Sequence, residues 1–108
     1  MEEQKKLLEL LQNNQTTIID KDRKINFFEM HVAFIGTPRK HQYDKSKIIL
    51  LSDPFSEKKF FYEFPVEAIG LVEELGTISS DDGKNALQIR LWIKKGTIYL
   101  KYEPFIVE

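Results

Sequence analysis

The segment from Leu87 to Lys94 constrains the fold more than any other stretch, because its side chains alternate between two kinds. Leu87, Ile89, Leu91 and Ile93 share one parity, and the mostly polar set Gln88, Arg90, Trp92 and Lys94 shares the other. A period of two residues is typical of a β-strand with one buried and one exposed face. Similar short apolar runs recur between Ile25 and Val107, with Asp, Gly, Pro and Lys at the breaks. The chain is therefore predicted to be mainly β, a small antiparallel barrel or half-barrel of six or seven strands with one N-terminal helix.

The predicted organisation has three parts. Residues 1–14 are predicted to form a helix, because residues 2–13 contain no Gly, Pro or β-branched residue and hold four leucines. Its leucines would pack over one opening of the barrel, and the alternative is a helix for self-association. Residues 15–24 are predicted to be a connector, and residues 25–108 a single β-barrel-like domain.

Turn residues divide this β-domain into strands. The pair Asp82-Gly83 is a strong hairpin signal between two apolar runs. The strands are expected at residues 25–35, 48–51, 60–64, 69–78, 87–94, 97–102 and 105–107. The expected core residues are Phe28, Met30, Val32, Phe34, Ile48, Leu50, Phe60, Tyr62, Phe64, Leu87, Ile89, Leu91, Ile93, Ile98 and Leu100.

Composition excludes several classes of protein. The chain has 108 residues, of which 42% are hydrophobic, enough for one folded domain with its own core. A net charge of −1 means that any electrostatic binding must come from local clusters. The absence of cysteine excludes disulfides and thiol catalysis. Together with an acidic N-terminus and no apolar stretch of membrane length, it favours a cytoplasmic protein without membrane contact.

One predicted loop, residues 37–47, concentrates positive charge. It holds four basic residues against a single aspartate, Asp44. A guanidinium suits phosphate or carboxylate, and a tyrosine ring offers a stacking surface. The loop could therefore recognise a phosphate-bearing ligand, an RNA strand or an acidic protein surface, and the alternative is a solvated, solubilising loop. The candidate ligand-binding residues are Arg39 as the bidentate contact, Lys40, His41, Tyr43, Lys45 and Lys47.

A second charged segment, from Glu63 to Glu74, contains four glutamates and no basic residue. These carboxylates could pair with the basic loop within the fold, or across subunits in a homo-oligomer. The alternative is that they occupy the exposed faces of strands and never meet the loop.

Catalytic and cofactor signatures are absent from the sequence. No nucleophile elbow, P-loop or dinucleotide-binding turn is present, and His31 and His41 lack neighbours at metal-ligand spacing. No cofactor or metal is expected. The sequence thus favours a non-enzymatic binding or adaptor module, with a structural or self-assembling protein as the alternative. A metal-dependent phosphohydrolase using Asp53 with Glu63 or Glu67 is a second alternative.

The stretch Ser52-Asp53-Pro54-Phe55 resembles the middle of the signature of soluble inorganic pyrophosphatases, in which three aspartates in the pattern Asp-x-Asp-Pro-x-Asp bind divalent metal. Only Asp53 matches, because Leu51 and Ser56 stand where the first and third aspartates belong. This departure removes two of the three charged ligands, so Asp-Pro is better interpreted as a turn that closes a strand.

A second resemblance covers more of the chain. It rests on the stretches Gly36–His41, Asp53–Phe55, Glu73–Leu75, Trp92–Gly96 and Pro104–Glu108. Together these look like a group of short, uncharacterised bacterial proteins, some of which carry an inorganic pyrophosphatase label. The resemblance implies a bacterial cytosolic protein.

Overall fold

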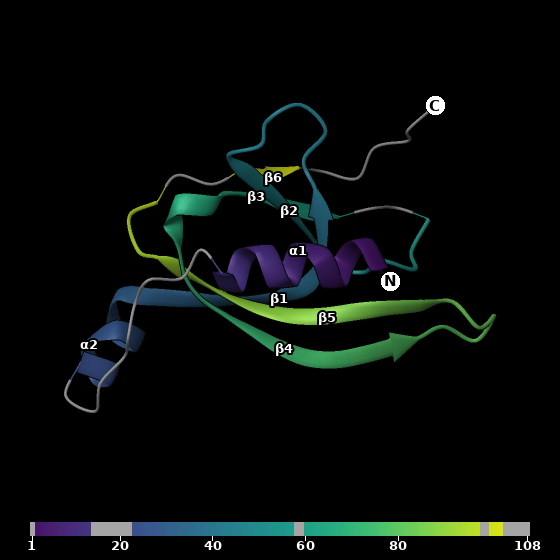
Figure 1. Ribbon diagram of the computed structural model, residues 1–108, viewed down its shortest axis with the longest axis horizontal. Helices are drawn as coiled ribbons and strands as arrows, with labels where there is room; N and C mark the ends of the chain where they lie inside the picture. Colours follow the sequence, from purple (N-terminus) through teal and green to yellow (C-terminus); the bar gives the residue numbers. More distant parts are fainter. Residues whose placement is uncertain (1, 14–22, 58–59, 98–99, 103–108) are drawn as a thin grey trace.

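The computed structural model describes residues 2–13, 23–57, 60–97 and 100–102, which form a bent antiparallel sheet with two α-helices (Figure 1). The strands are β1 (His31–Lys40), β2 (Lys47–Leu51), β3 (Phe61–Pro65), β4 (Ile69–Ser79), β5 (Asn85–Lys94) and β6 (Leu100–Tyr102). The helices are α1 (Glu2–Asn13), α2 (Arg23–Met30) and the short 3-10 helix η1 (Val66–Ala68). The prediction of a mainly β protein with an N-terminal helix is confirmed.

The sheet is open, so of the predicted barrel or half-barrel the closed form is wrong. Its strand order is β4-β5-β1-β2-β3-β6, and all neighbouring strands are antiparallel. Strands β4 and β6 stand at the two ends of this order, and no pairing joins them within the described residues. The strand count also differs from the expectation, because five strands form the body of the sheet and β6 adds only three residues at the β3 edge. Helix α1 covers the face of the sheet that would line the interior of a closed barrel.

Strand β1 belongs to both halves of the sheet. Residues 31–36 pair with β5, whereas residues 37–40 pair with β2. Gly36 lies where the strand passes from one half to the other, and a Cβ at this position would come within 2.4 Å of the backbone oxygen of Leu51. Glycine is required here because the two backbones approach so closely.

Helix α1 lies across the concave side of the bent sheet, between its two halves (Figure 1). Its buried residues are Leu8 and Leu11, which reach into the core, while Gln4 accepts a hydrogen bond from the backbone N–H of Leu87 at 2.6 Å. The helix forms because its residues are strong helix formers, and it binds the sheet through one leucine face. None of the described helices has the length and apolarity needed to cross a membrane.

The predicted strand over residues 25–35 is wrong in its first half, where α2 occupies residues 23–30 and so takes in the end of the predicted connector. The helix is closed by His31, whose Nδ1 donates a hydrogen bond to the carbonyl oxygen of Phe27 at 2.7 Å. The rings of these two residues also stack, with centroids 3.9 Å apart. This C-terminal cap is available only to a helix, because it joins residues four positions apart. The remaining residues of the predicted connector lie outside the described residues.

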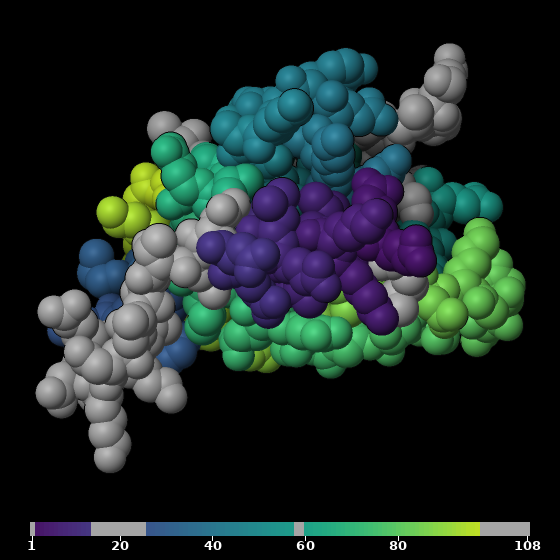
Figure 2. Space-filling model, viewed as in Figure 1, coloured from purple at the N-terminus to yellow at the C-terminus, as the bar shows by residue number. Residues whose placement is uncertain are grey.

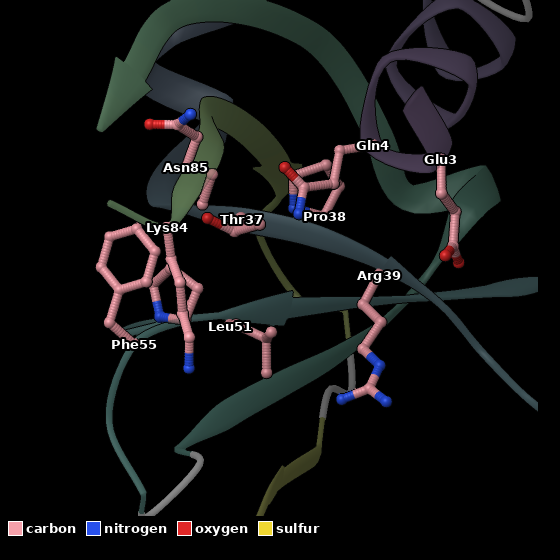
Figure 3. Close-up of a pocket in the computed structure, with 11 residues that line it drawn as sticks. Glu3, Gln4, Thr37, Pro38, Arg39, Leu51, Phe55, Lys84 and Asn85 are labelled. Carbon is pink, nitrogen blue, oxygen red and sulfur yellow. The ribbon is translucent and has the colours of Figure 1, made fainter. Parts of the chain in front are cut away.

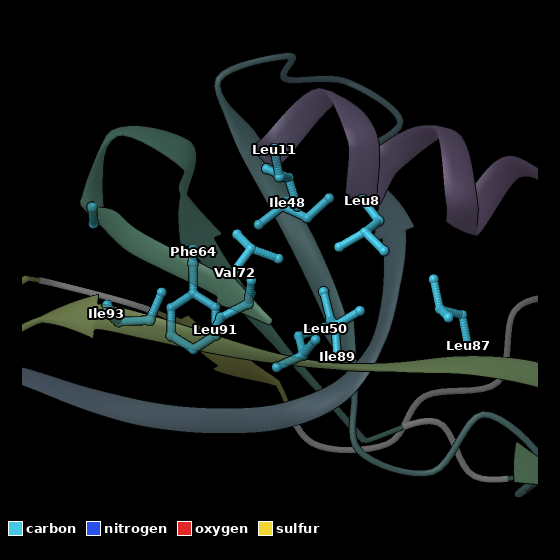
Figure 4. Packing of buried hydrophobic residues seen from close by; sticks show 11 residues of the cluster. Leu8, Leu11, Ile48, Leu50, Phe64, Val72, Leu87, Ile89, Leu91 and Ile93 are labelled. Carbon is cyan, nitrogen blue, oxygen red and sulfur yellow. The ribbon is translucent and has the colours of Figure 1, made fainter. Parts of the chain in front are cut away.

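The core lies between α1 and the concave face of the sheet (Figure 4). Seven predicted core residues are buried there: Ile48, Leu50, Phe64, Leu87, Ile89, Leu91 and Ile93. Phe34 and Tyr62 are half-buried and pack against this cluster. The core cluster is completed by Leu8, Leu11, Ala68 and Val72, which the predicted core list did not include, although the leucines of the helix were expected to pack against the β-domain.

Four predicted core residues lie elsewhere. Met30, Val32 and Phe60 are exposed, at 54%, 44% and 44%. Met30 ends α2, and Val32 is near the start of β1, which extends beyond α1 (Figure 1). Phe28 is half-buried and packs edge-on against Trp92, with ring centroids 4.6 Å apart, outside the core cluster. Ile98, the side chain of Leu100 and the predicted tail strand at residues 105–107 lie outside the described residues.

Candidate functional site

The predicted basic loop is only partly a loop. Arg39 and Lys40 end β1, and Lys47 begins β2, so residues 41–46 make the connection. Successive residues of a strand point to opposite faces. As a result, Arg39 and Lys40 line two different cavities.

The connection between β1 and β2 is held by its own side chains. The Nδ1 atom of His41 accepts hydrogen bonds from the backbone N–H groups of Tyr43 at 3.1 Å and of Asp44 at 2.9 Å. The Oδ1 atom of Asp44 accepts from the hydroxyl of Ser46 at 2.6 Å and from its backbone N–H at 2.9 Å. These bonds, the hydroxyl one first, lower the pKa of Asp44 below its ordinary value. The connection therefore has a defined turn geometry.

Glu63 lies beneath this connection and carries its counter-charge. Its Oε1 atom is 3.3 Å from Nε2 of His41 and 3.1 Å from Nζ of Lys47. Because Nδ1 of His41 accepts hydrogen bonds, the ring proton lies on Nε2 and faces this carboxylate. Glu63 is 7% exposed, so the contact is within the fold. Of the alternatives for the acidic segment, pairing within the fold therefore holds for Glu63.

A groove of about 680 Å³ separates α1 from the β1–β2 connection. In Figure 2 the helix (purple) lies directly below this connection (blue) on one face of the molecule. Its apolar lining comes from both sides: Leu7, Leu10, Leu11, Ile48 and Val66. Leu10 is the most exposed of them, at 57%. We call this cavity the helix groove.

Positive charge surrounds the apolar lining of the helix groove. Four predicted ligand-binding residues, Lys40, His41, Lys45 and Lys47, line it together with Lys6 of α1. Two carboxylates, Glu2 and Glu3, also line it, from the first turn of α1. The sequence pattern missed the helix side of this site, although Leu7, Leu10 and Leu11 have the i, i+3, i+4 spacing of one helix face.

A second cavity, of about 530 Å³, contains Arg39 (Figure 3). Its other cation, Lys84, comes from the turn between β4 and β5, and Phe55 comes from the segment between β2 and β3. The remaining lining residues include Thr37, Glu3, Gln4 and Asn85. No local sequence signal marks Lys84 as a partner of Arg39, since the two are brought together only by the sheet. We call this cavity the Arg39 pocket.

Tyr43 lines neither cavity and is 91% exposed. The other predicted candidates are thus divided, with Arg39 in one cavity and the three lysines and His41 in the other.

Asp53 has a structural contact in the turn after β2. Its Oδ1 atom accepts a hydrogen bond from the backbone N–H of Phe55 at 3.1 Å. This geometry is that of an aspartate-stabilised turn. Among the residues that the structure describes, no three His, Asp or Glu side chains gather closely enough to hold a metal ion.

The chain was compared with protein-family models, curated proteins and solved structures, and none of them matches it. The fold and the site place it in a coarse class, a small mainly β protein with an open antiparallel sheet and a covering N-terminal helix.

Proposed function

We propose that this protein is a non-enzymatic binding protein for an amphiphilic anion, which lies in the helix groove. The aliphatic part of the ligand contacts Leu7, Leu10 and Ile48, and its carboxylate or phosphate lies among Lys40, Lys45 and Lys6. The observation that carries the proposal is the juxtaposition of exposed Leu10 with a rim of lysines in one groove.

The size and lining of the helix groove support a small ligand. A volume of about 680 Å³ is within the range of cavities that enclose small molecules. Apolar lining with a few polar groups is the usual composition of such sites. The four lysines outnumber the two glutamates of the lining, which favours an anion over a cation.

The same geometry favours a small amphiphile over RNA. Proteins that bind single-stranded RNA combine a positively charged groove with aromatic rings on which the bases stack. Tyr43, the ring expected to supply such stacking, lies outside the groove. Among the described residues, the helix groove is lined by leucine side chains and by no Phe, Tyr or Trp ring, and leucine side chains suit the aliphatic chain of an amphiphile.

A binding role is favoured over catalysis because the histidine next to the lysines is already engaged. Both ring nitrogens of His41 have partners, Nδ1 with two backbone N–H groups and Nε2 with Glu63. A general base needs a free acceptor within reach of the substrate. His41 therefore serves to order the connection and to orient Lys47 and Glu63.

The proposal is tested by titrating labelled protein with sodium decanoate below its micelle concentration. We expect amide shifts in α1 and in residues 40–48. Leu10→Ser and Lys45→Ala should each weaken binding about fivefold to tenfold, as expected for one lost apolar or charged contact. The matched controls are Leu75→Ser and Lys95→Ala, which change exposed residues outside the groove.

Two further probes distinguish the contribution of the aliphatic chain to binding from that of the charged head group. Butyrate carries the same head group with a short chain and should bind much more weakly, as should decanol, which lacks the charge. The proposal fails if decanoate shifts no groove resonance, or if the control variants weaken binding as much as the groove variants. Strong shifts with a short RNA and none with decanoate would favour the RNA alternative.

A further inference from the structure

We infer that the Arg39 pocket is a second, separate ligand site, which binds a small phosphate ester carrying a planar ring. The inference does not depend on the helix groove, because it rests on different side chains on the opposite face of the end of β1. The residues that carry it are Arg39, Lys84, Thr37 and Phe55.

The first observation is a buried hydroxyl in the lining of the Arg39 pocket. Thr37 is 1% exposed, and its Oγ1 atom has no hydrogen-bond partner among the described residues. A buried polar atom without a partner is costly, and most such atoms in proteins are paired. In Figure 3 this oxygen lies on the side of Lys84 and Asn85, within the ring of lining residues. A ligand oxygen in the pocket would give the hydroxyl its missing partner.

The second observation is the presence of two cations, Arg39 and Lys84, in the lining of the Arg39 pocket. The side chains of Arg39 and Lys84 extend on the same side of the pocket, with Leu51 between them (Figure 3). Lys84 also faces Asp82 at 3.8 Å, but both side chains are mostly exposed, at 74% and 64%. Such surface pairs contribute little and give way readily. Guanidinium and ammonium groups placed together suit a phosphate, which accepts from both.

The polar lining of the pocket consists mainly of hydrogen-bond donors. Gln4 uses its Oε1 atom to accept from Leu87, and Asn85 uses its Oδ1 atom to accept from the hydroxyl of Ser79 at 2.6 Å. Their amide NH₂ groups therefore remain as donors. Donors from amide, hydroxyl and cationic groups are complementary to an oxyanion.

One carboxylate, Glu3, also lines the Arg39 pocket. It stands on the side of Arg39, away from Phe55 and Lys84 (Figure 3). A phosphate is therefore expected nearer to Lys84 and Thr37 than to Glu3. The ring of Phe55 lies beside Lys84, so an aromatic group attached to the phosphate can stack there.

The volume selects the class of ligand. About 530 Å³ exceeds what a single phosphate needs and matches a small organic phosphate. A nucleoside monophosphate or an aryl phosphate has both the ring and the dianion. Inorganic phosphate has the charge but no ring.

The test is a titration of the full chain with adenosine monophosphate, phenyl phosphate, inorganic phosphate and adenosine at low ionic strength. We expect amide shifts near Thr37, Phe55 and Lys84, with both ring-bearing phosphates binding at least about tenfold more tightly than inorganic phosphate or adenosine. The inference would be overturned if adenosine caused these shifts and the phosphates did not. It would also be overturned if all the anions bound with equal affinity.

The variants test the roles of individual groups. Arg39→Ala and Lys84→Ala should each weaken binding of phenyl phosphate about tenfold, and Arg39→Lys should recover only part of the loss because it lacks the planar fork. Glu3→Gln should strengthen binding. Lys95→Ala, outside the pocket, is the matched control.

Thr37→Val gives a readout that no merely structural role would produce. It removes the hydroxyl and keeps the shape, so the ligand-free protein should unfold at a higher temperature while phenyl phosphate binds more weakly. Thr77→Val, on an exposed face of β4, is the control and should change neither measurement. A lower unfolding temperature with unchanged binding for Thr37→Val would contradict the inference. Thr37→Val and Lys84→Ala, which change residues outside the helix groove, should leave decanoate binding unchanged, and this separates the inference from the proposed function.

Discussion

The side-chain oxygen Oε1 of Gln4 accepts a hydrogen bond of 2.6 Å from the backbone N–H of Leu87, 83 residues further along the chain. This contact ties the first turn of α1 to the beginning of β5. It matters for both cavities, because α1 supplies one wall of the helix groove and two lining residues of the Arg39 pocket.

Replacing Gln4 with Ala should lower the free energy of unfolding by about 1 kcal/mol, the usual value of one such hydrogen bond. Urea denaturation followed by circular dichroism measures this change. Gln12→Ala, at an exposed position of the same helix, is the matched control and should have almost no effect. Equal effects of the two substitutions would show that the contact with Leu87 does not stabilise the fold.

Replacing Glu63 with Gln should have two opposite effects. The fold should lose about 1–2 kcal/mol, because His41 and Lys47 lose a buried charged partner. Decanoate binding should become tighter, because a negative charge behind the lysines is removed. Denaturation and calorimetric titration measure the two effects. Glu67→Gln, an exposed residue of η1, is the control, and an equal result there would contradict this account.

The stability of the protein should depend on the protonation of Glu73. Its carboxylate accepts hydrogen bonds from Nε1 of Trp92 at 2.6 Å and from Nη1 of Arg90 at 3.2 Å, and these, with Trp92 as the larger cause, lower the pKa of Glu73. A pKa that is lower in the folded state gives stability that is complete above the unfolded pKa of about 4.3. It is lost as the pH falls through the lower, folded value.

The substitution Trp92→Phe should therefore reduce the part of the acid destabilisation that comes from Glu73. Urea denaturation between about pH 6 and pH 3 should show a smaller fall in stability for this variant and for Glu73→Gln than for the natural chain. The transitions are followed by circular dichroism, because Trp92 is the single tryptophan. Glu74→Gln, its exposed neighbour, should keep the natural pH dependence. A natural dependence in Trp92→Phe would contradict the prediction.

Replacing Gly36 with Ala should destabilise the fold more than replacing Gly70 with Ala. The new Cβ at position 36 would meet the backbone oxygen of Leu51 at 2.4 Å, whereas at position 70 it would meet the tips of the His31 and Phe27 side chains at 2.5 and 2.8 Å. Side chains can rotate away, but a paired strand cannot. We expect a loss of about 2 kcal/mol or more for Gly36→Ala, and a smaller loss for Gly70→Ala, by urea denaturation. The reverse order would show that β1 can shift at this point.

Local periodicity accounts for the parts of the fold that the sequence predicted well. Residues 87–94 alternate so regularly that their buried face, from Leu87 to Ile93, follows from the chain alone. Residues 25–30 show why the same reasoning failed elsewhere. Their alternation also suited a strand, but stacking and a hydrogen bond between Phe27 and His31 stabilise a helix there. Such a cap depends on positions four residues apart and has no signature in an alternating pattern.

The candidate residues were identified as a cluster in sequence, but their arrangement was not. Arg39 and Lys40 are neighbours in the chain and line different cavities, because β1 extends to Lys40 and alternates its side chains. The strand ends at Lys40 and not at residue 35 as expected, and this difference is enough to divide the site. Glu63 likewise meets His41 and Lys47 only because β2 and β3 pair.

By itself, the sequence determined most of the strand segments between residues 47 and 94, which leucines form the first helix and where positive charge gathers, since these depend on neighbours in the chain. Only the tertiary structure decided that the sheet stays open under α1, that the helix leucines face three lysines, and that Arg39 and Lys84 line one cavity. Such contacts join residues tens of positions apart, and their distances depend on strand register and on the direction in which a helix crosses the sheet. No local pattern of residues encodes either quantity.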